Sequence, residues 1–290
     1  MLRGCLLVTA PSSISSGFLS QRDWPLDAAC RPYSFLLLGR FRARRDFASW
    51  AQLDAHRMQE IISYLLLFRN RPHQREVLAG TLWGASSGTR SRKNLRQSLW
   101  HLQDTGGAAA AHPPAPLLLV EKEWVQVNFN NIWLDVAELE RAFDAVQAIP
   151  GERLTEEQAR TVGNAADLYR GDLLEGWQED WCLFERERLR AINLAMLEKL
   201  LGYCEAAGRF EEGLVHGERL LRSDRAHERA HWRMMRLSYL AGDRTGALRQ
   251  YDKCRAALAE ELGVSPGRLT RDLYDQICAD AEGALTPLVP

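Results

Sequence analysis

The chain has 290 residues and a formal net charge of −1, and 46% of its residues are hydrophobic. This length is sufficient for two domains that each have a core. No segment approaches the roughly 18 to 20 apolar residues that a membrane-spanning helix needs. The N-terminal apolar run from Cys5 to Ala10 is too short for a secretory signal. We therefore expect a cytoplasmic protein without a membrane partner.

The charge is divided unevenly along the chain. Residues 1–30 carry two basic and two acidic side chains, residues 31–130 carry 14 Lys and Arg against 7 Asp and Glu, and residues 131–290 carry 21 against 29. The segments thus have net charges of 0, +7 and −8. This asymmetry favours a basic domain that meets an anion and an acidic domain that avoids one. The alternative is chance variation among solvated helix faces. We expect residues 1–30 to be a disordered extension.

The predicted elements of the basic segment follow one another in an informative order. They are a strand candidate at 34–45, helices over 54–70, 73–83 and 89–103, and a two-stranded wing over 117–129. Asp54 is a candidate cap for the first helix. A strand, three helices and a terminal hairpin make a winged helix-turn-helix.

The loop between the second and third helices contains a catalytic pattern. Gly84 to Gly88 read GASSG, which fits the nucleophile elbow of a hydrolase and would make Ser86 a nucleophile. That elbow needs a buried strand before the serine, whereas residues 73–83 have the periodicity of an amphipathic helix. We therefore interpret Ser86 as a loop residue and expect no enzymatic activity; the alternative is a serine hydrolase.

The third helix has two distinct faces. Leu95, Leu99 and Leu102 fall on one stripe, which is expected to pack against the first two helices. The other side carries Arg, Lys, Asn and Gln side chains, which match phosphates and base edges in the major groove of DNA. Together with the wing, this helix provides the candidate DNA-binding residues Arg90, Arg92, Lys93, Asn94, Arg96, Gln97, Trp100, His101, Lys122 and Trp124. The alternative is an ordinary solvated basic face.

The wing is less basic than the helix. Glu121 and Glu123 flank Lys122, and carboxylates that face phosphates are repelled and forgo counterion release. We expect the wing to contact DNA through Lys122 and Trp124 alone, or hardly at all.

Several phrases resemble one family of bacterial regulators. FLLLGRF and REVLAGTLWGASSGTRSRKNLRQSLWHLQ are similar to the OmpR/PhoB-type winged helix of SARP-type transcriptional regulators. The bacterial transcriptional activation domain that follows it there resembles the later phrases IWLDVAELERAF, DLYRGDLLEGWQEDWCLFERERLR and ALRQYDKCRAALAEELGVSP. The resemblance covers residues 34–280. It implies an activator that binds double-stranded DNA and contacts RNA polymerase subunits or a second copy of itself as a homodimer.

The C-terminal half contains a repeat that is independent of this resemblance. Residues 205–214 and 239–248 align without gaps at a spacing of 34, the tetratricopeptide period. A Gly at each inter-helix turn lets the chain reverse, and stacked helix pairs cover one another's apolar faces. Thr155 and Gln158 predict a capping box. Such an array is expected to bind protein.

Cofactor and metal sites are not expected. None of the six cysteines lies in a C-x-x-C pair or near a His at metal-ligand spacing. The aromatic and Met residues of 232–239 are interpreted as core. We therefore predict a mainly α protein, with a winged helix-turn-helix at 31–130 and a tetratricopeptide-like domain at 131–290. Its predicted function is sequence-specific, DNA-binding transcription regulation, and the alternative is a helical adaptor that has lost DNA binding.

Overall fold

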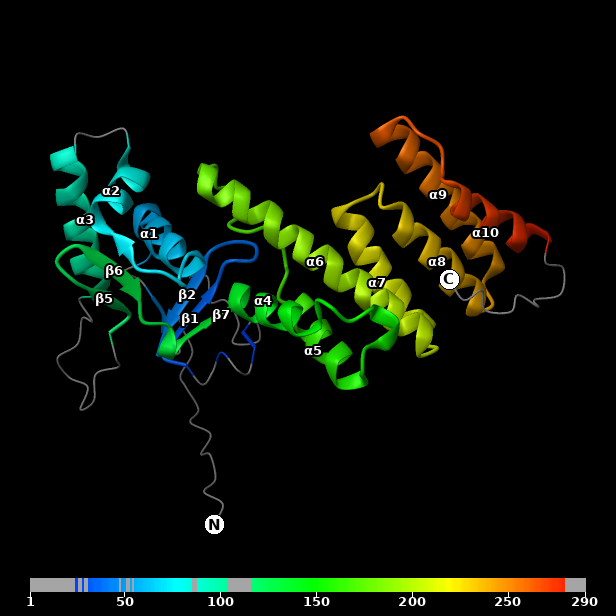
Figure 1. Ribbon diagram of the computed structural model, residues 1–290, viewed down its shortest axis with the longest axis horizontal. Helices are drawn as coiled ribbons and strands as arrows, with labels where there is room; N and C mark the ends of the chain where they lie inside the picture. The colour runs from blue at the N-terminus through cyan, green and yellow to red at the C-terminus, as the bar shows by residue number, and fades with distance from the viewer. Residues whose placement is uncertain are drawn as a thin grey trace, which may run out of the picture.

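The computed structural model describes residues 24, 25, 28, 31–46, 48–50, 53, 55–84, 88–103 and 116–279. A winged helix lies at one end of an elongated molecule, and a row of antiparallel helices extends from it to the other end (Figure 1). This mainly α architecture confirms the predicted fold class. None of the helices in the described ranges combines the length and apolar character that crossing a lipid bilayer requires.

A small mixed sheet opens the chain. Its strands, in the order β3-β2-β1-β7, are Ala48–Ser49, Arg42–Arg45, Tyr33–Leu36 and Ile132–Leu134. The single strand expected over residues 34–45 is therefore wrong, because β1 and β2 are antiparallel. Gly39 lies between them with φ +106°, a conformation that L side chains rarely adopt and that lets the chain reverse.

The winged helix follows the predicted order. Its elements are α1 (His56–Leu67), β4 (His73–Gln74), α2 (Arg75–Trp83), α3 (Gly88–Gln103), β5 (Leu118–Val120) and β6 (Trp124–Val127). The predicted wing is the antiparallel pair β5 and β6, and β4 adds a third strand beside β6. The second helix begins two residues later than expected because His73 and Gln74 pair with β6. The candidate cap Asp54 lies outside the described residues.

Helices make up most of the described residues from Asp135 onward. They are α4 (Asp135–Val146), α5 (Glu156–Ala166), α6 (Asp180–Ala206), α7 (Phe210–Ser223), α8 (Glu228–Leu240), α9 (Arg244–Leu262) and α10 (Arg268–Ala279), with short 3-10 turns at Phe129–Asn131 and Gly151–Arg153. The 34-residue repeat is confirmed as two helix pairs, α6 with α7 and α8 with α9. Gly208 and Gly242 have φ +71° and +85° at the equivalent inter-helix turns.

The predicted local features of this array are present. Thr155 and Gln158 form the reciprocal hydrogen bonds of a capping box. Met234 and Met235 are buried, as expected for core residues. The cysteines placed in helices are free thiols at Cys182, Cys204, Cys254 and Cys278, while Cys5 and Cys30 lie outside the described residues.

The winged helix and the helical array are joined through the start of α4. Oδ2 of the fully buried Asp135 accepts hydrogen bonds from the backbone N–H groups of Leu37 and Leu38, both at 2.8 Å, and Oδ1 accepts one from Val136 N–H. In the same region β1 pairs in parallel with β7. One apolar core therefore continues across the expected boundary between residues 130 and 131.

Part of the expected N-terminal extension packs on this junction. The Trp24 ring meets Trp133 edge-on at 6.5 Å, and the Arg44 guanidinium lies 4.4 Å from the Trp24 ring centre. Ala28 is buried, and its carbonyl accepts a hydrogen bond from Ser34 Oγ. Pro25 is also described, and the other residues of the segment 1–30 lie outside the described set.

Gly151 tests the contact between the turn before α5 and the backbone of α6. A Cβ at this position would lie 2.3 Å from the carbonyl oxygen of Lys199, whereas a Cβ at Gly163 inside α5 would meet open space. We expect Gly151→Ala to lower the free energy of unfolding by about 1 to 3 kcal/mol through overpacking. Gly163→Ala, the control, should raise it by up to about 1 kcal/mol. Urea unfolding measures both, and equal effects of the two substitutions would contradict the packing.

Asp135 makes stability depend on pH. Burial raises the pKa of Asp135 to about 7, although its three N–H donors act in the opposite direction. The unfolded carboxyl titrates at about pH 4. Since the unfolded chain loses this proton first, the free energy of unfolding should fall as the pH rises from about 4 to about 7.

The variant Asp135→Asn removes the titrating proton. Its free energy of unfolding should lack this decline, so the difference between wild type and variant should shrink or reverse as the pH rises through the same window. Asp144→Asn, on the exposed side of α4, is the control and should keep the wild-type profile. Parallel profiles for wild type and Asp135→Asn in urea unfolding would show that Asp135 does not titrate as described.

Candidate nucleic-acid interface

The recognition-helix candidate α3 is fixed by its apolar stripe. Leu95, Leu99 and Leu102 are each at most 2% exposed and pack into the core of the winged helix. Near the start of the helix, Ser91 Oγ donates a hydrogen bond of 3.2 Å to the carbonyl of Trp83 at the end of α2. These contacts hold α3 against α2, so that the opposite side of α3 faces solvent.

The candidate residues on α3 occupy that solvent side. Arg90, Lys93, Gln97 and Trp100 recur at steps of three and four residues, and all four are exposed. On the flank, Asn94 is half-buried and His101 is exposed. Trp100 is 60% exposed, and its ring lies 5.0 Å from that of His101. This surface thus offers cations, an amide and an exposed aromatic ring on one side of the helix.

A groove of about 620 Å³ lies between α3, the start of α2 and the wing. It brings together four of the predicted residues, namely Arg92, Lys93, Arg96 and Lys122. The other predicted residues, Arg90, Asn94, Gln97, Trp100, His101 and Trp124, are not among those that line it. Trp124 lies on β6 opposite Gln74 and is 41% exposed.

Sequence reasoning missed one cation of this groove. Arg75 lines it, and its backbone N–H donates a hydrogen bond of 2.8 Å to the carbonyl of Glu123 in the wing turn. The Arg75 guanidinium also reaches the carbonyl of Glu121 at 3.3 Å. The only sequence signal was a basic residue at the start of the second helix, since the pairing of β4 with β6 that places it in the groove is non-local.

Two carboxylates moderate the positive charge of the groove. Glu76 and Glu123 line it, and Glu76 Oε1 lies 2.7 Å from Arg92 Nη1. Both side chains of this ion pair are more than half exposed, and such pairs contribute about 0 to 1 kcal/mol. Arg92 is therefore able to exchange this partner for another anion at small cost.

The catalytic interpretation of the GASSG loop loses its structural basis. Ser86 itself lies outside the described residues. The element before it is the helix α2, which ends at Trp83. A nucleophile elbow requires a strand in that place.

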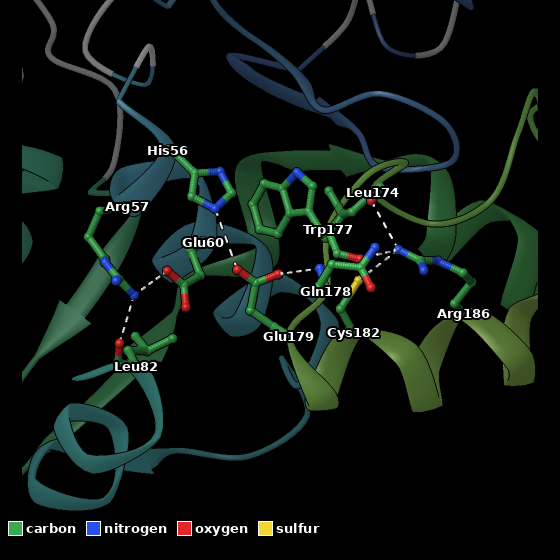
Figure 2. A network of polar contacts seen from close by, with 10 residues as sticks. All are labelled: His56, Arg57, Glu60, Leu82, Leu174, Trp177, Gln178, Glu179, Cys182 and Arg186. Atoms are coloured by element: carbon green, nitrogen blue, oxygen red, sulfur yellow. Dashed lines mark hydrogen bonds and ion pairs between the residues drawn. The ribbon is translucent and has the colours of Figure 1, made fainter. Parts of the chain in front are cut away.

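Polar contacts connect α1 of the winged helix with the start of α6 (Figure 2). Arg57 forms an ion pair with the buried Glu60 and donates a hydrogen bond of 2.7 Å to the carbonyl of Leu82 in α2. Burial raises the pKa of Glu60, and the Arg57 charge opposes this effect. On the same side of α1, His56 Nε2 lies 3.4 Å from Glu179 Oε1, just before α6 begins.

The loop that precedes α6 contacts α1 and is itself held in place by a side chain of α6. The Trp177 ring lies 4.6 Å from the His56 ring, centre to centre. Arg186 donates hydrogen bonds to the carbonyls of Leu174 and Trp177, at 3.1 and 3.0 Å (Figure 2), and a third to the carbonyl of Leu173 at 3.0 Å. The helix that carries the candidate interface therefore packs against α2, Arg57 links α2 to α1, and α1 contacts the start of α6.

Comparisons with known proteins extend these observations. The family described as bacterial transcriptional activator domain matches residues 134–278. The transcriptional regulatory protein MoaR1 of Mycobacterium bovis and of Mycobacterium tuberculosis is 23% identical over 237 residues, 78% of this chain and 73% of MoaR1. The regulatory protein AfsR of Streptomyces coelicolor is 26% identical over 264 residues, which are 88% of this chain and 25% of AfsR.

A solved structure shares the fold. It is Mycobacterium tuberculosis EmbR in complex with a low-affinity phosphopeptide, with a TM-score of 0.63 and 21% identity over 86% of this chain. The match spans 65% of the EmbR chain, slightly less than two thirds of its length. The relatives are transcription regulators, so the class of this protein is transcription regulation and not catalysis. The chain therefore belongs to the family of proteins with a bacterial transcriptional activator domain, in agreement with its resemblance to SARP-type regulators.

Proposed function

We propose that this regulator binds double-stranded DNA in a sequence-specific manner through α3 and the wing. The observation that carries the proposal is the groove in which Arg75, Arg92, Lys93, Arg96 and Lys122 converge beside the exposed face of α3. An α-helix fits the major groove of B-form DNA, and the phosphates on its rim lie where a wing reaches. Five cations in one groove match that anionic rim.

The side chains divide by position into two roles. Arg92, Arg96, Arg75 and Lys122 face the wing side and are assigned to phosphates, which fix the register of the protein on the duplex. Lys93, Gln97 and Arg90 project from the solvent face of α3 and are assigned to base edges, since Arg, Lys and Gln pair with G and A. Asn94 and His101 flank this face.

The aromatic candidates have a different assignment. Trp100 and Trp124 expose apolar rings, on α3 and on the wing. Exposed apolar surface next to base edges contacts thymine methyl groups or the sugar edge. Both residues are assigned to such apolar contacts.

We further propose that the helical array activates transcription by contacting RNA polymerase or a second copy of the chain. Support comes from apolar side chains that remain in solvent at its far end, with Leu262, Val264 and Leu269 at 61%, 50% and 76% exposure. Large apolar side chains that stay exposed close together mark contact surfaces. The acidic character of this half keeps it from competing for the same phosphates.

A helical adaptor without DNA binding is the second candidate function. The carboxylates of Glu76 and Glu123 in the groove favour it, because they repel phosphates. Salt-dependent binding to duplex DNA separates the two functions. Mapping the bound DNA in the native cell supplies the operator for that measurement.

The first functional test removes three cations of α3. The triple substitution of Arg90, Lys93 and Arg96 by Ala should weaken operator binding, and the loss of the phosphate contact assigned to Arg96 should flatten the dependence of log K on log salt by about 0.9. Helix content should stay unchanged because all three side chains are exposed. Fluorescence anisotropy over a salt series measures the affinity and the slope.

The matched control removes the same charge elsewhere. Arg222, Arg249 and Arg271 are exposed on α7, α9 and α10, and their triple substitution by Ala should leave the slope within error of wild type. If the α3 triple variant keeps the wild-type affinity and slope, the proposed DNA face is wrong. Equal loss in both triple variants would show that only net charge matters.

A separate test addresses the contact surface of the array. Leu262→Ser with Leu269→Ser should leave operator affinity unchanged and lower transcription activation in a purified system, together with self-association or polymerase binding. Phe184→Ser, which alters a 78% exposed side chain at the start of α6, is the control. Full activation by the double variant would remove this surface from the proposal.

A further inference from the structure

Three metal-ligating side chains meet between the helices of the first repeat. Cys204 is near the end of α6, and Glu212 and His216 are one turn apart on α7. One donor atom from each of the three lies within 4.8 Å of the other two. The α6 and α7 backbones are close here, since a Cβ at Gly213 would lie 3.0 Å from the Cβ of Cys204. The three donors therefore face one small space.

The two ring nitrogens of His216 differ in their surroundings. Nε2 lies 4.0 Å from Glu212 Oε1, whereas Nδ1 is buried and, within the described part of the chain, accepts or donates no hydrogen bond. Leaving a buried polar atom unpaired is costly, so such an atom in a folded protein needs an explanation. Burial lowers the pKa of His216, and the nearby Arg219 charge acts in the same direction. A neutral imidazole has a ring-nitrogen lone pair that can bind a metal.

The second repeat shows that these three residues are not required by the fold. At the spacing of 34, Cys204, Glu212 and His216 correspond to Ser238, Gly246 and Gln250. Gln250 is buried and has a partner, since its side-chain amide lies 2.7 Å from His231 Nδ1. Between the helices of the second repeat, the equivalent place therefore holds an amide that has a hydrogen-bond partner, and the three equivalent residues do not form a metal-ligating set.

We propose that Cys204, Glu212 and His216 form a binding site for a divalent transition metal of the zinc class. Thiolate, imidazole and carboxylate are the donors that Zn²⁺ takes in tetrahedral sites, and three protein donors leave the fourth position to water. Glu212 and His216 also line a cavity of about 250 Å³, which gives that water a place. The metal would link α6 to α7 next to their connecting turn.

The proton balance of binding follows from the thiol. Burial raises the pKa of Cys204 to about 11, so the metal-free site holds a protonated thiol. Coordination forms the metal–sulfur bond and releases that proton to solvent, while His216 binds without a change in protonation. The Glu212 carboxylate is available to a metal because the nearby arginines have other partners. Arg209 lies closer to Glu156, at 2.7 Å, than to Glu212, at 3.6 Å. Arg219 is paired with Asp167 at 2.7 Å.

Cobalt(II) is the probe because its spectrum reports the ligands. Full-length protein is stripped with a chelator under reducing conditions and titrated with Co²⁺. We expect one equivalent per chain, a thiolate-to-cobalt charge-transfer band, the visible bands of a tetrahedral site, and displacement by Zn²⁺. Cys204→Ser and His216→Gln introduce the residues of the second repeat, so both variants should fold. Each should lose the charge-transfer band or the tetrahedral spectrum. Each should also bind Co²⁺ at least about 100-fold more weakly, since loss of an outer-shell partner alone costs about 10- to 100-fold in metal affinity.

The control variant is Cys254→Ser, which removes another buried thiol, in α9. It should retain the wild-type cobalt spectrum and affinity. The proposal is overturned if wild-type protein binds no stoichiometric Co²⁺, if its spectrum lacks thiolate ligation, or if Cys204→Ser and His216→Gln bind as wild type does. The readout is independent of DNA binding, so failure of the proposed function would leave it interpretable.

Discussion

The Asp135 carboxyl group accepts hydrogen bonds from the backbone N–H groups of Leu37 and Leu38, nearly a hundred residues earlier in the chain. These two donors lie just beyond the end of β1, where the sheet provides no further partner, and a buried N–H group left unpaired costs about 1 to 3 kcal/mol. Asp135 is also the first residue of α4. One buried side chain therefore ends the sheet, begins the helical array and fixes the two relative to each other.

The arrangement of the remaining elements depends on this junction. With β7 held against β1, the loop at Leu173 and Leu174 reaches the sheet, where Leu174 N–H bonds the carbonyl of Leu37. The same loop leads into α6, so α6 begins beside α1 of the winged helix (Figure 1). The start of α6 therefore contacts α1, and α1 contacts the last turn of α2 through Arg57.

The parts of this structure that were predictable are those set by local periodicity. The helices, the capping box at Thr155 and the repeated turns at Gly208 and Gly242 were visible because their causes lie within a few residues. The missed features all depend on pairing at a distance. Gly39 was visible as a glycine, but only the pairing of β1 with β2 makes it a turn, and Arg75 enters the groove because β4 joins β6. For the proposed interface, sequence reasoning placed the exposed residues of α3 on one side of the helix but could not identify which of them share a groove.

The two copies of the 34-residue repeat share a backbone path but differ in the polar side chains between their helices. Equivalent glycines and equivalent helix pairs show that the spacing specifies the path of the chain. The side chains between the helices are not specified in the same way, since the first repeat has Cys204 and His216 where the second has Ser238 and Gln250. Both sets are compatible with close helix packing, so neither is required by the fold. Polar chemistry that differs between two otherwise equivalent repeats is therefore better explained by a local role than by the architecture, and the unpaired nitrogen of His216 marks the repeat in which such a role is to be sought.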